Sequence, residues 1–243
     1  MLKLKIADGI EMLKLEMNMM GRESIIYPTL LWDDNTVILV DAGLSISLPG
    51  IKSAMKDAGV PFENLNKIII THQDIDHIGG IKSILNELTD VRVLAHEEEK
   101  PYIQGEEKFV RLNSGFMDRI NAFPEEDREK ILDMFKNAPV KVDTTLTDCQ
   151  ELSDCGGIIV IHAPGHTPGH ICLYHETSKT MIVGDAMNVI DGQLVGANKQ
   201  LMNEEETKSA INSLKKFEKY DIENIITYHG GLFNDNPNQK IKE

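Results

Sequence analysis

The sequence predicts an α/β protein in which two packed β-sheets carry helices on their outer faces. Two observations support this prediction. Short β-prone runs alternate with helical runs in residues 25–95, and a similar alternation returns in residues 157–228. The chain has 243 residues, of which 41% are hydrophobic and 26% charged, so it is long enough and apolar enough to bury a core. Strand-rich halves that each carry helices fit two sheets packed face to face.

The first 40 residues are expected to form strands. Residues 2–6 and 13–17 alternate apolar with charged side chains at a period of two, which is typical of half-buried strands. Residues 25–32 and 36–40 are further β-prone apolar runs. The Asp-Asp-Asn sequence between those two runs supplies turn chemistry, so the pair predicts a hairpin.

The next fifty residues introduce helices between strands. Residues 48–59 follow a helical pattern that closes on a glycine, and residues 67–71 form a short β-branched run. Residues 78–88 predict another helix and residues 91–95 another strand. A polar segment, residues 72–77, therefore lies between a strand and a helix.

Residues 97–145 differ from the rest of the chain because they are highly charged and carry four phenylalanines. They predict two or three helices, the last beginning near Pro124. We interpret this segment as a helical cap inserted into the fold. Packing between helices is the favoured role for its apolar side chains, while a substrate pocket or a homodimer interface are the alternatives.

The second half repeats the organisation of the first. Strands are expected at residues 157–162, 170–174 and 180–183, followed by a helix over residues 204–220 and a strand over residues 224–228. No repeat, low-complexity tract or linker rich in glycine, serine and proline separates the halves. The sequence therefore predicts a single domain over residues 1–243 with the cap at about residues 97–145.

The charge balance disfavours several classes of partner. The chain has 39 acidic and 25 basic residues and a formal charge of -14, which repels the phosphate backbone of nucleic acids. Its longest aliphatic runs are about four residues, far short of the ~20 that a membrane span needs. We expect a small-molecule substrate, with neither nucleic acid nor membrane as a partner.

Cysteine usage and the start of the chain bear on the cellular compartment. The three cysteines, Cys149, Cys155 and Cys172, are an odd and sparse set without Cys-x-x-Cys spacing, so we interpret all three as structural thiols in a reducing compartment. Residues 1–5 alternate apolar and basic side chains and lack the apolar core of a signal peptide. A cytoplasmic protein is expected.

One segment concentrates side chains that bind metals. In Thr71-His-Gln-Asp-Ile-Asp-His-Ile-Gly-Gly80, four imidazole or carboxylate groups fall within six residues, namely His72, Asp74, Asp76 and His77. Burying such groups without partners is costly, and metal ions would compensate their charges. A polar loop satisfied by its own hydrogen bonds is the alternative explanation.

Three further segments supply the remaining ligands of the predicted site. His166, Asp185 and His229 each follow an apolar β-type run and each lie beside a glycine that permits a sharp turn. Strand ends of this kind commonly carry functional groups on a rigid scaffold. Four separate segments thus predict one metal centre.

The four segments together resemble the metallo-β-lactamase superfamily. That family carries a His-x-His-x-Asp-His motif, then a Pro-Gly-His segment, an aspartate and a final histidine, and the match spans nearly the whole chain. The resemblance implies an αββα four-layer sandwich with two divalent metal ions. It places His72, Asp74 and His166 on one metal and Asp76, His77 and His229 on the other. It puts Asp185 between the metals and makes Asp41, in Asp41-Ala-Gly43, a support of the ligand loop.

Asp74 departs from the family pattern, which most often has histidine at this position. Two divalent ions with three aspartates and one hydroxide are formally neutral, whereas histidine at position 74 would leave one positive charge. We expect zinc as the metal, with manganese or iron better accepted than by an all-imidazole site.

The resemblance implies a hydrolase in which a hydroxide bridging the metals attacks the substrate. Asp76 would assist proton transfer to the leaving group. The capped architecture resembles lactonase and thioesterase-like members, so a small ester, lactone or thioester is the expected substrate. A phosphodiesterase, a diiron-type redox protein and a metal-binding protein without catalysis are the alternatives.

The other histidines and Tyr228 are given structural roles. We expect His162 to be packed or hydrogen-bonded, His170 to support the ligands, His96 to act locally and His175 to lie in a surface turn. Tyr228 precedes His229 and could stabilise an oxyanion, but a half-buried packing role is favoured.

Overall fold

The computed structural model describes residues 5–19 and 22–242. The expected strand over residues 2–6 therefore falls largely outside the described residues. Within them, the first main sheet has seven strands in the order β1-β2-β5-β6-β7-β8-β9. These strands are Lys5–Ala7, Ile10–Met12, Thr29–Trp32, Val37–Val40, Lys67–Ile70, Arg92–His96 and Thr144–Leu146.

The second main sheet has six strands within the described residues, in the order β10-β11-β12-β13-β16-β17. They are Glu151–Leu152, Ile158–His162, Ile171–His175, Thr180–Ile182, Asn224–Thr227 and Gly231–Phe233. Pairing is parallel from β6 through β9 and between β13 and β16, and antiparallel elsewhere in the two sheets. The predicted hairpin over residues 25–40 is the β5–β6 pair.

The two sheets bury a common apolar layer between them. Ile38 and Ile69 of the first sheet belong to the same buried cluster as Val160, Leu173 and Ile226 of the second. Central strands that are covered on both faces need apolar side chains at successive positions, which explains the uninterrupted runs of β6 and β7. This layer is the centre of the sandwich.

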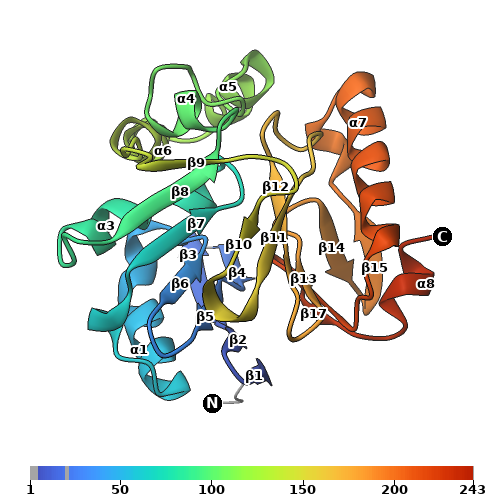
Figure 1. Cartoon of the computed structure of the whole chain (residues 1–243). Helices are drawn as coiled ribbons and strands as arrows, with labels where there is room; N and C mark the ends of the chain where they lie inside the picture. Colours follow the sequence, from blue (N-terminus) through green and yellow to red (C-terminus); the bar gives the residue numbers. More distant parts are fainter. Residues whose placement is uncertain (1–4, 20–21, 243) are drawn as a thin grey trace.

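Helices and a hairpin cover the outer faces of both sheets (Figure 1). The first sheet is covered by α1 (Leu48–Ala58), α2 (Ile75–Ile78) and α3 (Ile81–Leu85), whose apolar side chains join its outer cluster. The second is covered by α7 (Glu204–Leu214), the 3₁₀ turn Lys215–Lys219 and the β14–β15 hairpin. The chain thus forms the predicted αββα sandwich. The strands β3 (Leu15–Met19), β4 (Arg22–Ile26), β14 (Met187–Ile190) and β15 (Gln193–Gly196) form two separate hairpins, and α8 (Pro237–Lys240) ends the fold.

The segment between β8 and β9 carries the predicted helices of the cap. They are α4 (Lys100–Ile103), α5 (Ser114–Ile120) and α6 (Glu125–Asn137), and they lie together beside one end of the first sheet (Figure 1). Helix α6 starts directly after Pro124, as the sequence predicts. Phe109 and Phe135 are buried in the outer core of the first sheet, so these two side chains pack between elements, as favoured above.

Several details differ from the sequence-based expectations. The expectation for His175 was wrong: this residue ends β12 and is only 1% exposed. Its two ring nitrogens lie 2.6 Å from Ser178 Oγ and 2.5 Å from the Cys155 carbonyl oxygen. The β14–β15 hairpin was not expected, because its short strands do not alternate clearly. The helix expected at residues 78–88 begins earlier, as two short helices on either side of the Gly79-Gly80 pair.

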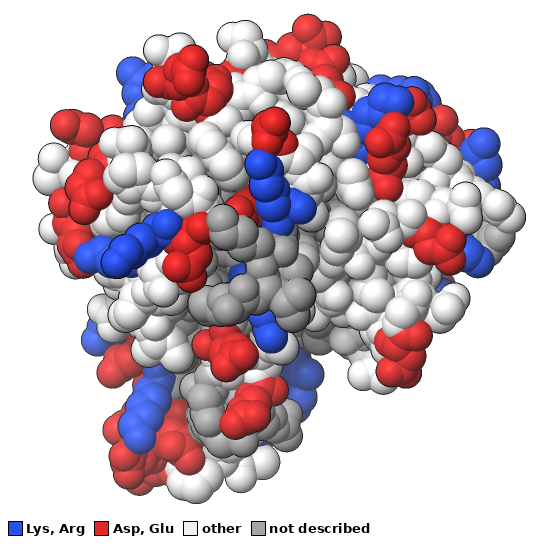
Figure 2. Space-filling view, turned by 90° about the horizontal axis from the view of Figure 1, so that it is seen from below, with Lys and Arg blue, Asp and Glu red and all other residues white. Residues whose placement is uncertain are grey.

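The surface agrees with the acidic composition. Figure 2 shows acidic and basic side chains interspersed over the face seen from below.

Among the described residues, Cys155 and Cys172 are buried and Cys149 is exposed, and all three are free thiols. Burial raises the pKa of the Cys155 thiol to about 12, so this residue is an inert structural cysteine. No helix in the described part of the chain is both long and apolar enough to span a membrane.

Candidate metal centre

The predicted ligands meet at one end of the sandwich because each follows the end of a strand. His72 comes two residues after β7, Asp185 three residues after β13 and His229 two residues after β16. His166 lies in the loop between β11 and β12. A rigid double sheet therefore holds loops that are far apart in sequence beside one another.

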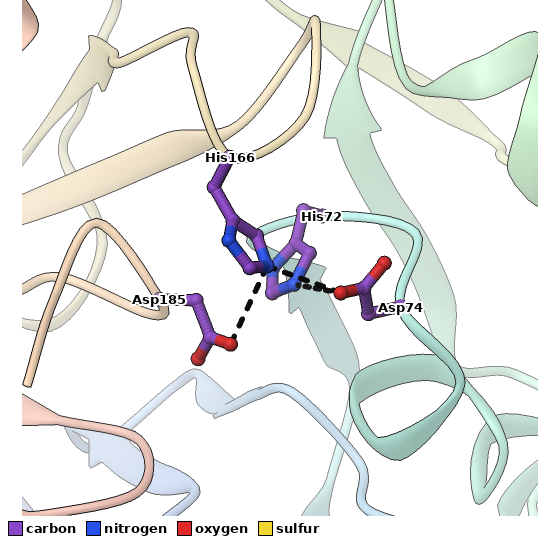
Figure 3. Close-up of side chains that lie close together, drawn as sticks. All are labelled: His72, Asp74, His166 and Asp185. Atoms are coloured by element: carbon purple, nitrogen blue, oxygen red, sulfur yellow. Dashed lines mark hydrogen bonds and ion pairs between the residues drawn. The ribbon is translucent and has the colours of Figure 1, made fainter. Parts of the chain in front are cut away.

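Four side chains form a first ligand group, which we define as His72, Asp74, His166 and Asp185. Figure 3 shows them directed toward one another from three separate loops. His166 Nε2 lies 3.0 Å from Asp74 Oδ2 and 3.5 Å from Asp185 Oδ2. His72 Nε2 lies 3.5 Å from the same Asp74 oxygen. Ligand atoms around a tetrahedral zinc ion, with bonds of ~2.1 Å, are also separated by roughly 3.4 Å.

Three side chains form a second ligand group, which consists of Asp76, His77 and His229. His229 Nε2 lies 3.3 Å from Asp76 Oδ2. Asp185 Oδ1 lies 3.4 Å from both His77 Nε2 and His229 Nε2, whereas its Oδ2 faces the first group. Asp185 thus lies between the two groups, at the place the resemblance predicted.

The local backbone explains why one short motif serves both groups. Asp74 is still extended, and α2 begins at the next residue, so Asp76 and His77 lie in its first turn and face the second group. Gly80 lets α2 pack closely, because a Cβ there would lie 2.1 Å from the Ala42 carbonyl oxygen. The motif thus contributes two side chains to each group, as the resemblance implied.

Buried partners hold the ligands in place. Asp41 accepts hydrogen bonds from the Thr71 backbone and hydroxyl, both at 2.8 Å, and its Oδ2 lies 2.8 Å from His77 Nδ1. His170 Nε2 accepts the backbone N–H of Asp185 at 3.2 Å. Asp41 and His170 therefore occupy the supporting positions expected from the sequence.

The buried ligand atoms lack ordinary partners. Within the described residues, His72 Nε2, His77 Nε2 and Asp185 Oδ1 are buried without a hydrogen-bond partner. Buried polar atoms in proteins are nearly always satisfied, so these three atoms without partners, spread over the two ligand groups, indicate bound cations. Imidazole and carboxylate together are a donor set that suits zinc, manganese and iron. The residues present therefore fit a metal centre.

Charged neighbours within the site lower the pKa of Asp185 and raise the pKa of His229. Burial would raise the pKa of Asp185, but His229 and His77 bring it well below its usual range. Burial would lower the pKa of His229, but Asp185 and Asp76 raise it to about 10. The carboxylates are consequently charged at neutral pH and ready to bind a cation.

Comparison with known families identifies the family to which the chain belongs. The model of the metallo-beta-lactamase superfamily matches residues 21–229, which cover most of the chain and every predicted ligand. The chain belongs to the metallo-β-lactamase superfamily. This membership confirms the resemblance and the prediction of a metal-dependent hydrolase.

Curated relatives within the superfamily are distant. The chain is 27% identical to the probable metallo-hydrolase YflN of Bacillus subtilis over 214 residues, covering 82% of this chain and 76% of that protein. It is 29% identical to the probable metallo-hydrolase YybB of the same organism, over 63% of this chain and 58% of YybB. A hydroxyacylglutathione hydrolase of Pseudomonas aeruginosa is 27% identical over 54% of this chain and 36% of its own length.

Solved structures of the superfamily share the fold. A metallo-beta-lactamase family protein from Thermus thermophilus superposes with a TM-score of 0.75 at 22% identity, covering 98% of this chain and 78% of that chain. The class B3 di-zinc metallo-beta-lactamase LRA-12 from an Alaskan soil metagenome gives 0.66 at 17% identity, over 93% and 77% of the two chains. At these identities the likeness concerns the fold alone.

The structure adds two residues that the sequence analysis missed. Arg111 reaches from the segment between α4 and α5 to Asp74 and His166. Glu99 is fully buried and accepts the backbone N–H groups of Gln73 and Gly169, both at 2.8 Å. Neither residue belongs to a local motif. The one sequence feature that could have indicated a buried role was the charged Glu99 shortly after an apolar strand.

A second histidine pair lies apart from the seven ligands. The rings of His96 and His162 stack with centroids 4.1 Å apart and planes inclined by 14°. His162 Nε2 lies 2.9 Å from the Pro168 carbonyl oxygen, and His96 Nδ1 accepts the Glu98 backbone N–H at 3.3 Å. Both histidines thus make the local contacts expected from the sequence.

Tyr228 packs against the second group. Its ring stacks on His77 at a centroid distance of 3.8 Å, and its hydroxyl donates to the Asp76 carbonyl oxygen at 2.6 Å. It is 3% exposed, more deeply buried than the half-buried residue expected. Its hydroxyl is already engaged, which favours the packing role over an oxyanion contact.

Proposed function

We propose that the chain is a binuclear metal-dependent hydrolase of small esters, lactones or thioesters. In this proposal the first metal is held by His72, Asp74 and His166, the second by Asp76, His77 and His229, and Asp185 joins the two. Zinc is the preferred ion, with manganese or iron as substitutes. The observation that carries the proposal is Asp185, whose two carboxylate oxygens face different ligand groups.

Divalent ions bound in these positions supply Lewis acidity and activate water near neutral pH. The chain supplies the remaining functions. Asp41 keeps the Nδ1 proton of His77 on the outer side of the ring, so that Nε2 faces the site. Asp76 is the most exposed carboxylate of the seven ligands at 26%, and we propose that it takes up a proton and passes it to the leaving group.

The substrate class is supported by two observations. The hydroxyacylglutathione hydrolases that the chain resembles are named for a small acylated substrate. The chain carries a formal charge of -14, and the face seen in Figure 2 intersperses basic with acidic side chains, which disfavours binding of a long phosphodiester polymer. We also propose that the chain is a single domain in which residues 97–145 form the cap. The three free thiols support the further proposal of a cytoplasmic location.

The experiment is a comparison of substrates under defined metals. The full chain is stripped with a chelator, reloaded with Zn²⁺, Mn²⁺ or Fe²⁺, and assayed with a lactone, an acyl thioester and a bis-aryl phosphodiester. We expect two metal ions per chain by elemental analysis and hydrolysis of the lactone or thioester. His77→Gln should lower both the metal content and the activity, while Asp57→Asn, an exposed substitution on α1, serves as the control away from the ligand groups.

Other outcomes would replace the proposal. Hydrolysis of the phosphodiester alone would assign the chain to the phosphodiesterases. Oxygen consumption by the iron-loaded protein with a reductant, without any hydrolysis, would indicate the redox alternative. Stoichiometric metal binding with no activity on any substrate would indicate a protein that has lost catalysis.

A further inference from the structure

An arginine from the cap segment occupies the first ligand group. Arg111 Nε donates to both oxygens of Asp74, at 2.8 and 3.1 Å. Its Nη2 lies 2.7 Å from His166 Nε2 and 3.1 Å from the His166 carbonyl oxygen. Its Nη1 donates to the Leu201 carbonyl oxygen at 3.0 Å. All three guanidinium nitrogens are engaged, and the side chain is only 12% exposed.

Buried contacts fix the backbone next to Arg111. The Val110 backbone N–H donates to Gln73 Oε1 at 2.7 Å. Gln73 itself lies in the metal motif, and its Nε2 donates to buried Glu99 at 3.0 Å. The same motif that supplies the ligands therefore anchors the arginine beside them. The position of Arg111 is therefore fixed by buried hydrogen bonds of the fold, unlike that of an exposed side chain.

Arg111 and a metal ion need the same atom of His166. A guanidinium can only donate hydrogen bonds, so His166 Nε2 must be the acceptor at 2.7 Å. A neutral imidazole nitrogen has one lone pair for either a hydrogen bond or a metal bond. His166 Nε2 is also the atom that faces Asp74 and Asp185 in the first group. Metal binding there consequently requires Arg111 to release His166.

In the described residues, no arginine pairs with the carboxylates around the second ligand group. In the part of the chain that the structure describes, the ion pairs of Asp76 and Asp185 involve only histidines. Asp74, in contrast, pairs with a permanently charged arginine. A histidine can release its proton when a metal ion binds, whereas Arg111 keeps its charge and has to move away, so only the first group holds a fixed positive charge.

We propose that Arg111 takes the place of a cation in the first ligand group, so that the two groups bind metal in sequence. This inference rests on the proposed binuclear site. The second group fills first. A metal ion enters the first group only when Arg111 moves away from His166. Metal binding to the first group is therefore coupled to movement of the Arg111 side chain in the cap segment.

The first test measures zinc binding to the full chain in zinc-buffered solutions. Wild type should show two equivalents of clearly different affinity. Arg111→Met keeps the length of the side chain and removes the charge, so it should tighten the weaker equivalent by roughly ten- to a hundredfold, the range of a charge-assisted hydrogen bond. Arg128→Met, on α6 of the same cap, is the matched control and should leave both equivalents unchanged.

The second test uses the wild-type chain and does not depend on the folding of a variant. Phenylglyoxal modifies accessible arginines, and peptide mapping by mass spectrometry reports each site. Arg111 should be protected in the metal-free protein and after one equivalent of zinc, and should be modified several-fold faster after the second. Arg119 and Arg128 should react equally in all three states.

The outcomes separate this inference from the proposed function. Two zinc equivalents whose affinities are the same in wild type and Arg111→Met, together with constant protection of Arg111, would overturn the inference and leave a binuclear hydrolase intact. Failure of wild type and both variants to bind zinc at all would overturn the proposed function itself.

Discussion

Asp41 Oδ2 lies 2.8 Å from His77 Nδ1 within a site where both side chains are buried. Asp41 adopts a positive φ of 62°, a conformation that asparagine and aspartate tolerate better than most residues. The carboxylate accepts the Nδ1 proton and thereby presents Nε2 of His77 to the second ligand group. This contact makes Asp41 a positioning residue.

Asp41→Asn tests this role without disturbing the backbone. The amide keeps the left-handed conformation but is a weaker acceptor for the imidazole, so we expect metal affinity at the second group to fall about 10- to 100-fold. Chelator competition followed by elemental analysis measures the change. Asp57→Asn, an exposed substitution on α1, is the control. Wild-type affinity in Asp41→Asn would show that the contact does not orient His77.

Asp74→His tests how the carboxylate influences metal choice. The substitution replaces a hard oxygen ligand by an imidazole, so the ratio of zinc to manganese affinity should rise by roughly tenfold or more. Because Asp74 also pairs with Arg111, the measurement should be repeated with Arg111→Met present. An unchanged ratio in both backgrounds would mean that Asp74 does not set the metal preference.

The stability of the metal-free protein should depend on His229. Burial lowers the pKa of His229, but Asp185 and Asp76 raise it to about 10, above the value near 6.5 of an unfolded chain. The protonated ring therefore stabilises the fold fully below pH 6.5, and this contribution is lost as the pH rises through about 10. Urea denaturation at pH values from about 6 to about 10 should show a steeper decline in stability for wild type than for His229→Gln. Parallel curves would contradict the coupling.

Glu99 should contribute strongly to stability because it joins two ligand loops. Its carboxylate accepts from the Gln73 backbone, the Gln73 side chain and the Gly169 backbone. Glu99→Gln turns one acceptor into a donor inside this buried arrangement, and we expect a loss of about 2–3 kcal/mol in the free energy of unfolding. Glu97→Gln, an exposed neighbour, should change it by less than about 0.5 kcal/mol. Equal stability of both variants would refute the role of Glu99.

Local pattern predicted the layers of the fold well, but not its smaller hairpins. The runs that became β6 and β7 are apolar throughout because both faces of these central strands are covered, and this continuity is visible in the sequence. The β14–β15 strands are short and partly exposed, so they lack a clear period. His175 was misplaced for a related reason, since its buried partners Cys155 and Ser178 come from the ends of neighbouring segments.

The sequence by itself determined the seven candidate ligands and the layered fold. Each ligand follows a strand and lies near a glycine, so local chemistry and strand ends already indicate a shared site. The resemblance already implied how the ligands divide into two groups around Asp185, whereas only the tertiary structure decided that Arg111 enters the first of them. The physical reason is that Arg111 lies in a charged segment with no motif, and its contacts with Asp74, His166 and Leu201 exist only after three distant loops meet.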